Sequence, residues 1–263
     1  MTDFQTIAYT VSDGVATIEL ARPEKRNAID ETMFRELGRA AEQAAEDPEV
    51  RVVLVKGQGP SFCAGIDLNF LAQLSGLVGA SPRDFIELAQ RPARLLHLME
   101  KPTIAAVRGH ALGAGFQLAL ACDLRIAAED AQFAIWELRY GIIPDLGGNE
   151  PLASLVGIAR AKEIVWTGRL VTADEADRIG LVNRVVPAEM LQKETEALVE
   201  ELAAAPPIPL ALTKAIYNRI DETPYEAVLE REAESQLKAL ASEDHKEAVA
   251  AFLEKRPPRY SGR

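Results

Sequence analysis

Short apolar runs that recur between amphipathic helical patterns constrain the fold of this chain more than any other feature. Residues 52–56, 103–107 and 124–127 form three such runs, each about as long as one β-strand. A strand that is apolar on both faces needs helices on both sides of its sheet. The pattern therefore predicts an α/β architecture in which parallel strands alternate with helices.

The N-terminal region carries a hairpin pattern followed by a helix pattern. Residues 7–11 and 15–20 alternate apolar and polar side chains around the turn Ser12-Asp13-Gly14, which predicts a β-hairpin. Residues 31–46 place apolar side chains on one helical face, and Asp30 is suited to cap the start of that helix. Two strands and a helix are therefore expected first.

Farther along the chain, capping patterns and prolines indicate more helices. Ser81 and Thr172 each begin a sequence typical of a helix start, with an acidic residue three positions later. After Pro187 the pattern is nearly all helical and is interrupted by prolines. We therefore expect a main domain over residues 1–187 and a helical region over residues 188–263.

Charge and composition narrow the class of protein. The net charge of −11 opposes attraction to nucleic acid or to anionic membranes. No stretch approaches the roughly 18 to 20 apolar residues of a membrane span, and the first residues carry no leader pattern. A cytoplasmic protein that binds neither nucleic acid nor membrane is expected.

Cys63 and Cys122 should be reduced thiols. Because the sequence has no CxxC or HExxH spacing, no metal site is expected.

Two glycine-containing segments are candidates for close backbone contact with a ligand. Residues 61–68 place Gly65 just after a strand, and residues 109–123 carry a GxxxGxG spacing that leads into an apolar helix. Free amides at that helix start can hold an anion, because no bulky side chain is in the way. Tight turns and close helix packing explain the same glycines equally well, so neither segment alone identifies a function.

Taken together, three sequence blocks carry a resemblance to a known family. The blocks FCAGIDL, GHALGAGFQLALACDLRIA and AQFAIWELRYGIIPDLGG resemble, in order and spacing, the signature blocks of the enoyl-CoA hydratase/isomerase (crotonase) family. The resemblance extends from RPEKRNAID through TGRLVTADEADRIGLVNRVVP to FLEKR, which is almost the whole chain. It implies a crotonase-like spiral of β-β-α units with a helical C-terminal trimerisation subdomain, assembled as a homotrimer or a dimer of trimers.

The resemblance also implies a reaction and its residues. The substrate would be an acyl-CoA thioester, with no separate cofactor because CoA is part of the substrate. The backbone amides of Ile66 and Ala114 would form an oxyanion hole for its enolate. Glu137 matches the second of two glutamates that hydratases carry, whereas Gln117 replaces the first. Asp145 stands where dienoyl-CoA isomerases have an acid.

These proton carriers rank three functions. Two carboxylates, Glu137 and Asp145, favour double-bond isomerisation. A hydratase that uses Glu137 with Gln117 assisting is the second candidate, and a non-catalytic acyl-CoA-binding protein is the third. Each residue also has an alternative role: an internal or substrate hydrogen bond for Gln117, a salt bridge with Arg139 or another basic group for Glu137, and a cap on a helix beginning near Leu146 for Asp145.

The remaining site residues are carried over by the same resemblance. Arg22 and Lys25 are expected near the CoA phosphates and Ala28 and Ala64 near the adenine. The full expected CoA-binding set is Arg22, Lys25, Ala28, Ala64, Gly65, Asp67, Gly113, Phe252 and Lys255, the last two often supplied by a neighbouring subunit. The expected acyl pocket is lined by Leu68, Phe70, Leu71 and Trp136, together with Leu74 and Phe85. A solvated turn for the cationic residues and core packing for the apolar ones are the alternatives.

Overall fold

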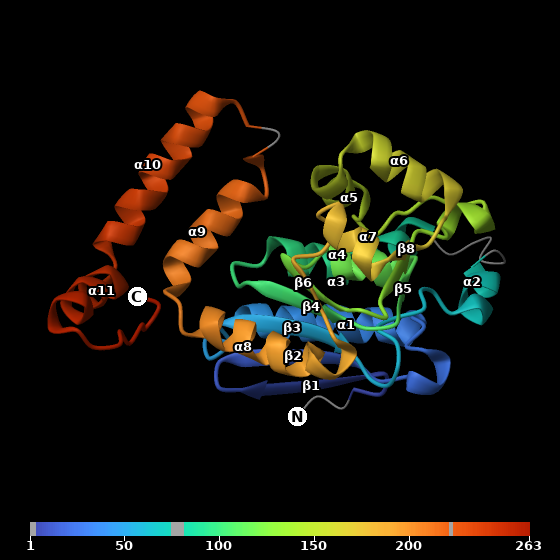
Figure 1. Cartoon of the computed structure of the whole chain (residues 1–263), viewed down its shortest axis with the longest axis horizontal. Helices are drawn as coiled ribbons and strands as arrows, with labels where there is room; N and C mark the ends of the chain where they lie inside the picture. Colours follow the sequence, from blue (N-terminus) through green and yellow to red (C-terminus); the bar gives the residue numbers. More distant parts are fainter. Residues whose placement is uncertain (1–3, 75–81, 221–222) are drawn as a thin grey trace.

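A computed structural model describes residues 4–74, 82–220 and 223–263, with the side chains of Leu74 and Pro82 excepted (Figure 1). Its larger sheet has six strands in the order β1-β2-β3-β4-β6-β9. β1 and β2 pair antiparallel, and every other neighbouring pair is parallel. The strands are β1 Ile7–Ser12, β2 Val15–Leu20, β3 Val52–Gly57, β4 Thr103–Val107, β6 Leu124–Ala128 and β9 Arg184–Val186.

A smaller sheet of three strands runs alongside, in the order β5-β7-β8. Its strands are β5 His110–Leu112, β7 Gln132–Ala134 and β8 Val171–Thr172. Along the chain, β4 of the large sheet is followed by β5 of the small sheet and then by a helix, α4 Ala114–Leu120. β6 and β7 repeat this alternation. The expected α/β spiral of β-β-α units is therefore confirmed.

The remaining elements are helices. They are α1 Glu31–Glu46, α2 Leu68–Leu74, α3 Pro82–Leu98, α5 Asn149–Val156, α6 Ile158–Thr167, α7 Ala173–Arg178, α8 Leu191–Ala203, α9 Pro207–Tyr217, α10 Tyr225–Ala241 and α11 Glu243–Glu254, with short 3-10 turns η1 Pro23–Lys25, η2 Glu137–Tyr140 and η3 Ala188–Met190. None of the described helices combines the length and the apolar character that crossing a membrane would require.

The local predictions near the N-terminus are confirmed. The hairpin turn places Asp13 and Gly14 at positive φ, as a two-residue hairpin loop requires. Asp30 caps α1 by accepting a hydrogen bond of 2.9 Å from the Met33 amide, and Thr172 caps α7 by accepting one of 3.3 Å from Glu175. The predicted cap at Ser81 lies outside the described residues.

The large sheet is covered on both faces, as its apolar strands predicted. On one face, Val53, Val55 and Ala105 join the main core with α1 and α4. On the other face, the alternate strand residues, such as Val52 and Leu54, pack against α8. α8 therefore covers one face of the large sheet, although it lies in the helical C-terminal region.

The remaining C-terminal helices extend away from the sheet (Figure 1). Lys214 of α9 joins them to the core, because its ammonium contacts Asp123 at 2.8 Å and donates to the carbonyl oxygens of Leu96 and Lys101. In α10 only Val228 is buried, and in α11 only Asp244 and Ala251. These two helices carry large exposed apolar side chains: Tyr225, Leu229, Leu237, Leu240, Val249, Phe252 and Leu253.

Buried Arg125 ties the core behind α4 together. Its guanidinium donates to the carbonyl oxygens of Leu181 at 2.9 Å and Cys122 at 2.7 Å. Arg125→Met would leave these buried acceptors unpaired and should lower the free energy of unfolding by about 3 to 5 kcal/mol. Urea unfolding measures this loss. Arg184→Met, which changes a half-exposed arginine, should stay within about 0.5 kcal/mol of the wild type, and equal midpoints for both variants would contradict the prediction.

Candidate active site

The two glycine-containing segments meet at a cavity of about 1290 Å³. Its walls include parts of α1, of residues 64–71, of α3, and of residues 112–114 and 136–146. Residues that are far apart in the sequence therefore face one space. In Figure 1 the neighbouring α2 lies at the opposite end of the molecule from α10 and α11.

The first segment reaches the cavity through a short parallel bridge between Ile29 and Ile66. Ile29 donates its amide to Gly65 at 2.8 Å, and Asp67 donates its amide to Ile29 at 2.9 Å. Successive amides of an extended segment point to opposite sides. The Ile66 amide therefore points away from Ile29, and it has no acceptor within the described part of the chain.

The second segment turns at Gly113 and enters α4. Gly113 has a φ of +49° and donates its amide to Ala134 at 2.8 Å. Ala114 is the first residue of α4, so its own amide has no partner within the helix. A Cβ atom added to Gly65 would lie 2.8 Å from the Leu112 oxygen and 3.8 Å from the Ala114 nitrogen. The two segments are therefore in backbone contact at the cavity wall.

Three glycines of these segments serve the tight turns and close packing that were the structural alternative to ligand contact. Gly65, with a φ of +99°, and Gly113 adopt turns that other residues rarely adopt. Gly115 serves close packing, because a Cβ there would lie 2.5 Å from the Cβ of Cys63. Burial raises the pKa of the Cys63 thiol to about 12, as expected for an unreactive core cysteine.

Gln117 and Glu137 form a buried pair, and the Glu137 carboxylate lies against Gly113. The amide nitrogen of Gln117 donates to Oε1 of Glu137 at 2.6 Å. The amide oxygen of Gln117 accepts from the backbone of Leu146 at 2.8 Å and of Gly148 at 3.4 Å. Two backbone donors thus fix which end of the amide faces the carboxylate. The internal hydrogen bond considered for Gln117 is confirmed.

The second carboxylate oxygen of Glu137 is the unusual atom of the site. Oε2 is buried and has no hydrogen-bond partner among the described residues. A Cβ on Gly113 would lie 3.3 Å from Oε1 and 3.5 Å from Oε2, so the carboxylate rests against the backbone next to Ala114. Burial raises the pKa of Glu137, and the charge of Asp145 adds to the rise, although the hydrogen bond from Gln117 opposes it.

The predicted alternative for Glu137, a salt bridge with Arg139, is wrong. Arg139 instead lies over the Trp136 ring, with its guanidinium carbon 4.5 Å from the ring centroid, and donates to the Gly168 oxygen at 2.7 Å. The backbone turn of η2 points the two side chains to different surroundings. No cation within the described residues neutralises Glu137.

Asp145 lines the same cavity, and burial raises its pKa. Its predicted alternative as a helix cap is wrong, because α5 begins at Asn149 and its N-cap is Gly148. Two glycines at 147 and 148 delay the helix by three residues. The Asp145 backbone oxygen instead accepts a hydrogen bond of 2.6 Å from Gln90 of α3, which holds the turn against the cavity wall.

Most of the expected CoA-binding residues lie at the cavity. The lining includes Lys25, Ala28, Ala64, Gly65, Asp67 and Gly113. Arg22 does not line it, because its guanidinium is held between Asp30 and Asp67. Phe252 and Lys255 lie at the end of α11, away from the cavity within one chain (Figure 1).

The expected acyl-pocket residues divide in the same way. Leu68, Leu71, Trp136 and Phe85 line the cavity. The prediction for Phe70 is corrected: its side chain lies in the core, where its ring packs edge-to-face on Phe85 with centroids 5.4 Å apart. The side chain of Leu74 lies outside the described residues.

Several wall residues were not predicted. They are Phe34, Leu88, Tyr140, Ile142, Ile143 and Leu146. Four of them fall between Glu137 and Gly147, where apolar side chains occur in a segment without helix or strand periodicity. An irregular apolar segment next to a predicted site residue is the signal that could have identified them.

Comparison with known proteins identifies the family of this chain. Residues 10–263 match the family model described as enoyl-CoA hydratase/isomerase. A crotonyl-CoA hydratase from Syntrophomonas wolfei is 37% identical over 254 residues, which is 96% of each chain. A solved enoyl-CoA hydratase subunit from Geobacillus kaustophilus has a TM-score of 0.90 and 38% identity, with 100% of each chain covered.

A third similar protein was solved with a ligand. The solved protein, from Thermobifida fusca YX in complex with acetoacetyl-CoA, has a TM-score of 0.83 and 35% identity. The match covers 90% of the present chain and 95% of the Thermobifida chain. The fold and these similarities define an enzyme of the crotonase class. The chain belongs to the enoyl-CoA hydratase/isomerase family.

Proposed function

We propose that this enzyme is an enoyl-CoA hydratase, which adds water to the double bond of a 2-enoyl-CoA. The observation that carries the proposal is the buried Oε2 of Glu137, which has no partner among the described residues and lies beside the Gly113–Ala114 backbone. The names of the relatives support hydration over the isomerisation that the sequence ranked first.

In the proposed reaction, the amides of Ile66 and Ala114 donate to the thioester oxygen. They stabilise the enolate that forms when water attacks C3. Glu137 accepts a proton from the attacking water at Oε2 and returns a proton to C2. The product gains one hydroxyl at C3 and one hydrogen at C2, so one carboxylate completes the addition.

Gln117 supports this assignment by occupying the other carboxylate oxygen. Because its amide nitrogen donates to Oε1, we assign proton transfer to Oε2, which has no partner among the described residues. The second N–H of the same amide group can hold the attacking water. Because the amide is neutral, it adds no second negative charge beside Glu137. A second negative charge there would raise the pKa of Glu137 further.

For the CoA moiety, we assign the residues of the cavity mouth. Lys25 is the cation that we place near the phosphates, since its ammonium has no partner among the described residues. The backbone around Ala28 and Ala64 would hold the adenine. No separate cofactor enters the reaction.

Product identity tests the proposed function directly. Incubation with a 2-enoyl-CoA should give a 3-hydroxyacyl-CoA, whose mass is higher by one water molecule. A product of unchanged mass that chromatography separates from the substrate would show isomerisation instead. Tight binding of the thioester without any product would contradict both enzymatic proposals and favour an acyl-CoA-binding protein.

Isomerisation is the second candidate function, and Asp145 is the observation that favours it. A second carboxyl group with a raised pKa lines the cavity, so two acids could move a proton between carbons.

Under the hydratase proposal, Asp145→Asn should keep hydration of 2-enoyl-CoA within about tenfold of the wild type. Product analysis with 2-enoyl, 3-enoyl and 3,5-dienoyl esters in deuterated water measures this. Loss of about 10² or more with every ester would make Asp145 an essential proton carrier.

The raised pKa of Glu137 predicts a pH dependence. Glu137 must be ionised to accept a proton from water, so kcat/KM should fall as the pH drops through the pKa of Glu137. Because burial and Asp145 raise that pKa, the acidic limb should lie above the ordinary range of glutamate. Asp145→Asn should move the limb to lower pH by removing the neighbouring charge. A limb within the ordinary range would contradict this account.

We also propose that the chain assembles as a homotrimer or a dimer of trimers through the exposed apolar side chains of α10 and α11. In this proposal, residues 188–263 form the oligomerisation region beside the core of residues 1–187. Phe252 and Lys255 would then reach the cavity of a neighbouring subunit. Light scattering after gel filtration measures the mass, and a monomer at micromolar concentration would contradict the assembly.

A further inference from the structure

Arg22 occupies the centre of a small polar network next to the first glycine segment. Its Nη1 donates to the Ala28 oxygen at 2.6 Å and lies 3.0 Å from Oδ2 of Asp30. Its Nη2 lies 3.2 Å from Oδ2 of Asp67. The side chain is 16% exposed, so the guanidinium is largely shielded from solvent.

Each carboxylate that Arg22 contacts also organises the start of a helix. Asp30 caps α1 with its other oxygen, Oδ1. Asp67 accepts from the Asn69 amide with its own Oδ1 at 3.0 Å, where α2 begins. Arg22 therefore joins two helix starts through oxygens that the caps leave free. Hydrogen bonds from Asn69 and Arg22 lower the pKa of Asp67 although burial opposes the shift, so Asp67 stays ionised.

The network holds the peptide that presents the Ile66 amide. Asp67 follows Ile66 directly, and the Asp67 amide is bonded to Ile29 on the other strand of the bridge. Ala28, which Arg22 also contacts, precedes Ile29. The guanidinium thus contacts a residue next to each strand of the bridge, Ala28 beside Ile29 and Asp67 beside Ile66.

We infer that Arg22 is a positioning residue that fixes the Ile66 amide toward the thioester oxygen, and that it does not bind the CoA phosphates. This inference rests on the proposed oxyanion hole. Arg22 does not line the cavity, and its two acidic partners would repel a phosphate group. Lys25, in the same turn, lines the cavity and has no partner among the described residues, so it suits a phosphate better.

Two substrates separate positioning from phosphate binding. An enoyl-CoA carries the nucleotide phosphates, whereas the matching enoyl-pantetheine thioester lacks them. If Arg22 positions the amide, Arg22→Met should lower kcat by about 10- to 100-fold with both thioesters, because a displaced donor acts on the reacting carbonyl. If Arg22 binds phosphate, the variant should raise KM for the CoA ester alone and leave kinetics with the pantetheine ester unchanged, which would overturn the inference.

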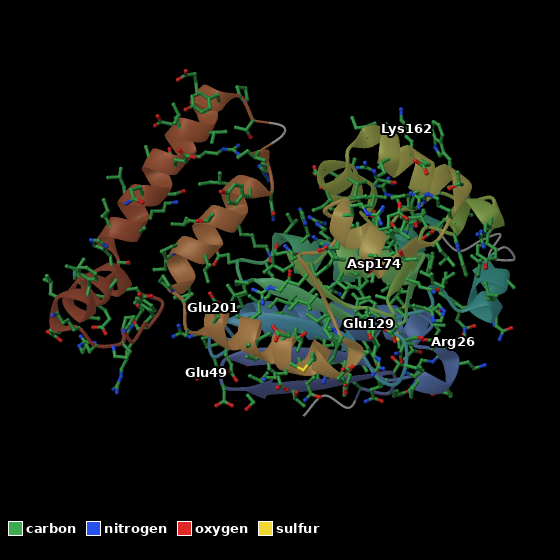
Figure 2. The ribbon with its side chains drawn as sticks, viewed as in Figure 1. Arg26, Glu49, Glu129, Lys162, Asp174 and Glu201 are labelled. Atoms are coloured by element: carbon green, nitrogen blue, oxygen red, sulfur yellow. The ribbon has the colours of Figure 1, made fainter. Side chains whose placement is uncertain are left out.

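Two further variants control for charge and for folding. Arg26→Met removes an exposed cation from the same turn and should leave kcat with the pantetheine ester near the wild-type value (Figure 2). Asp67→Asn keeps an acceptor for the Asn69 amide but breaks the ion pair, and it should lower kcat with both esters as Arg22→Met does. Thermal unfolding of each variant shows that the compared proteins are folded.

A binding readout keeps this test independent of turnover. The absorption band of a 3-arylacryloyl thioester moves to longer wavelength when its carbonyl accepts hydrogen bonds. The wild type and Arg26→Met should produce the full shift, and Arg22→Met a reduced one. A full shift in Arg22→Met would overturn the inference. A shift in the wild type without turnover of any enoyl thioester would contradict the hydratase proposal alone.

Discussion

Glu137→Gln should lower kcat for hydration by about 10² to 10⁴, the contribution of a positioned acid–base group. Glutamine has the shape of glutamate, and its amide oxygen can accept the same hydrogen bond from Gln117. It cannot exchange protons near neutral pH. Packing and CoA binding should therefore persist while the chemical step slows.

The rate of 3-hydroxyacyl-CoA formation at saturating 2-enoyl-CoA measures this loss. Glu201→Gln is a matched control, because it neutralises an exposed glutamate on α8, away from the cavity (Figure 2). The control should keep the wild-type rate. A Glu137→Gln enzyme within about twofold of the wild type would show that another group carries the proton.

Ile66→Pro should lower kcat by about 10² to 10³, because proline removes the amide that we propose as a donor to the developing oxyanion. That amide bonds to no other group in the described part of the chain, so the substitution removes a donor without breaking an internal hydrogen bond. Gly113 and Ala114, on the facing segment, are left unchanged. The effect should therefore appear in kcat for every thioester.

Ile66→Val is the control for this substitution, because it keeps the amide and most of the apolar side chain. It should retain the rate within a few-fold of the wild type, and both variants should show cooperative thermal unfolding. If folded Ile66→Pro enzyme turned over at the wild-type rate, the Ile66 amide would have no part in the reaction.

Much of the fold could be predicted because its signals are local. The hairpin over 7–20, the helix Glu31–Glu46 and the buried strand Thr103–Val107 follow from side-chain periodicity and capping residues within a short window. The small sheet was not predicted. β5, β7 and β8 have two or three residues each, which is too short for a period to be recognised.

The site could be predicted only as far as its backbone turns and single residues. Gly65 and Gly113 mark where the chain approaches itself, and Glu137 lies in a recognisable block. The bond from Gln117 to Glu137 and the contact of Arg22 with Asp67 join residues 20 and 45 positions apart. Such partners depend on how the elements pack, and no local pattern specifies them.

A crystal structure of the enzyme with acetoacetyl-CoA bound would test the central claim most directly. The account predicts that the thioester oxygen lies about 2.7 to 3.1 Å from the backbone nitrogens of both Ile66 and Ala114, with Glu137 beside the neighbouring carbons. A thioester oxygen bound to only one of these nitrogens, or facing a different part of the cavity, would contradict it.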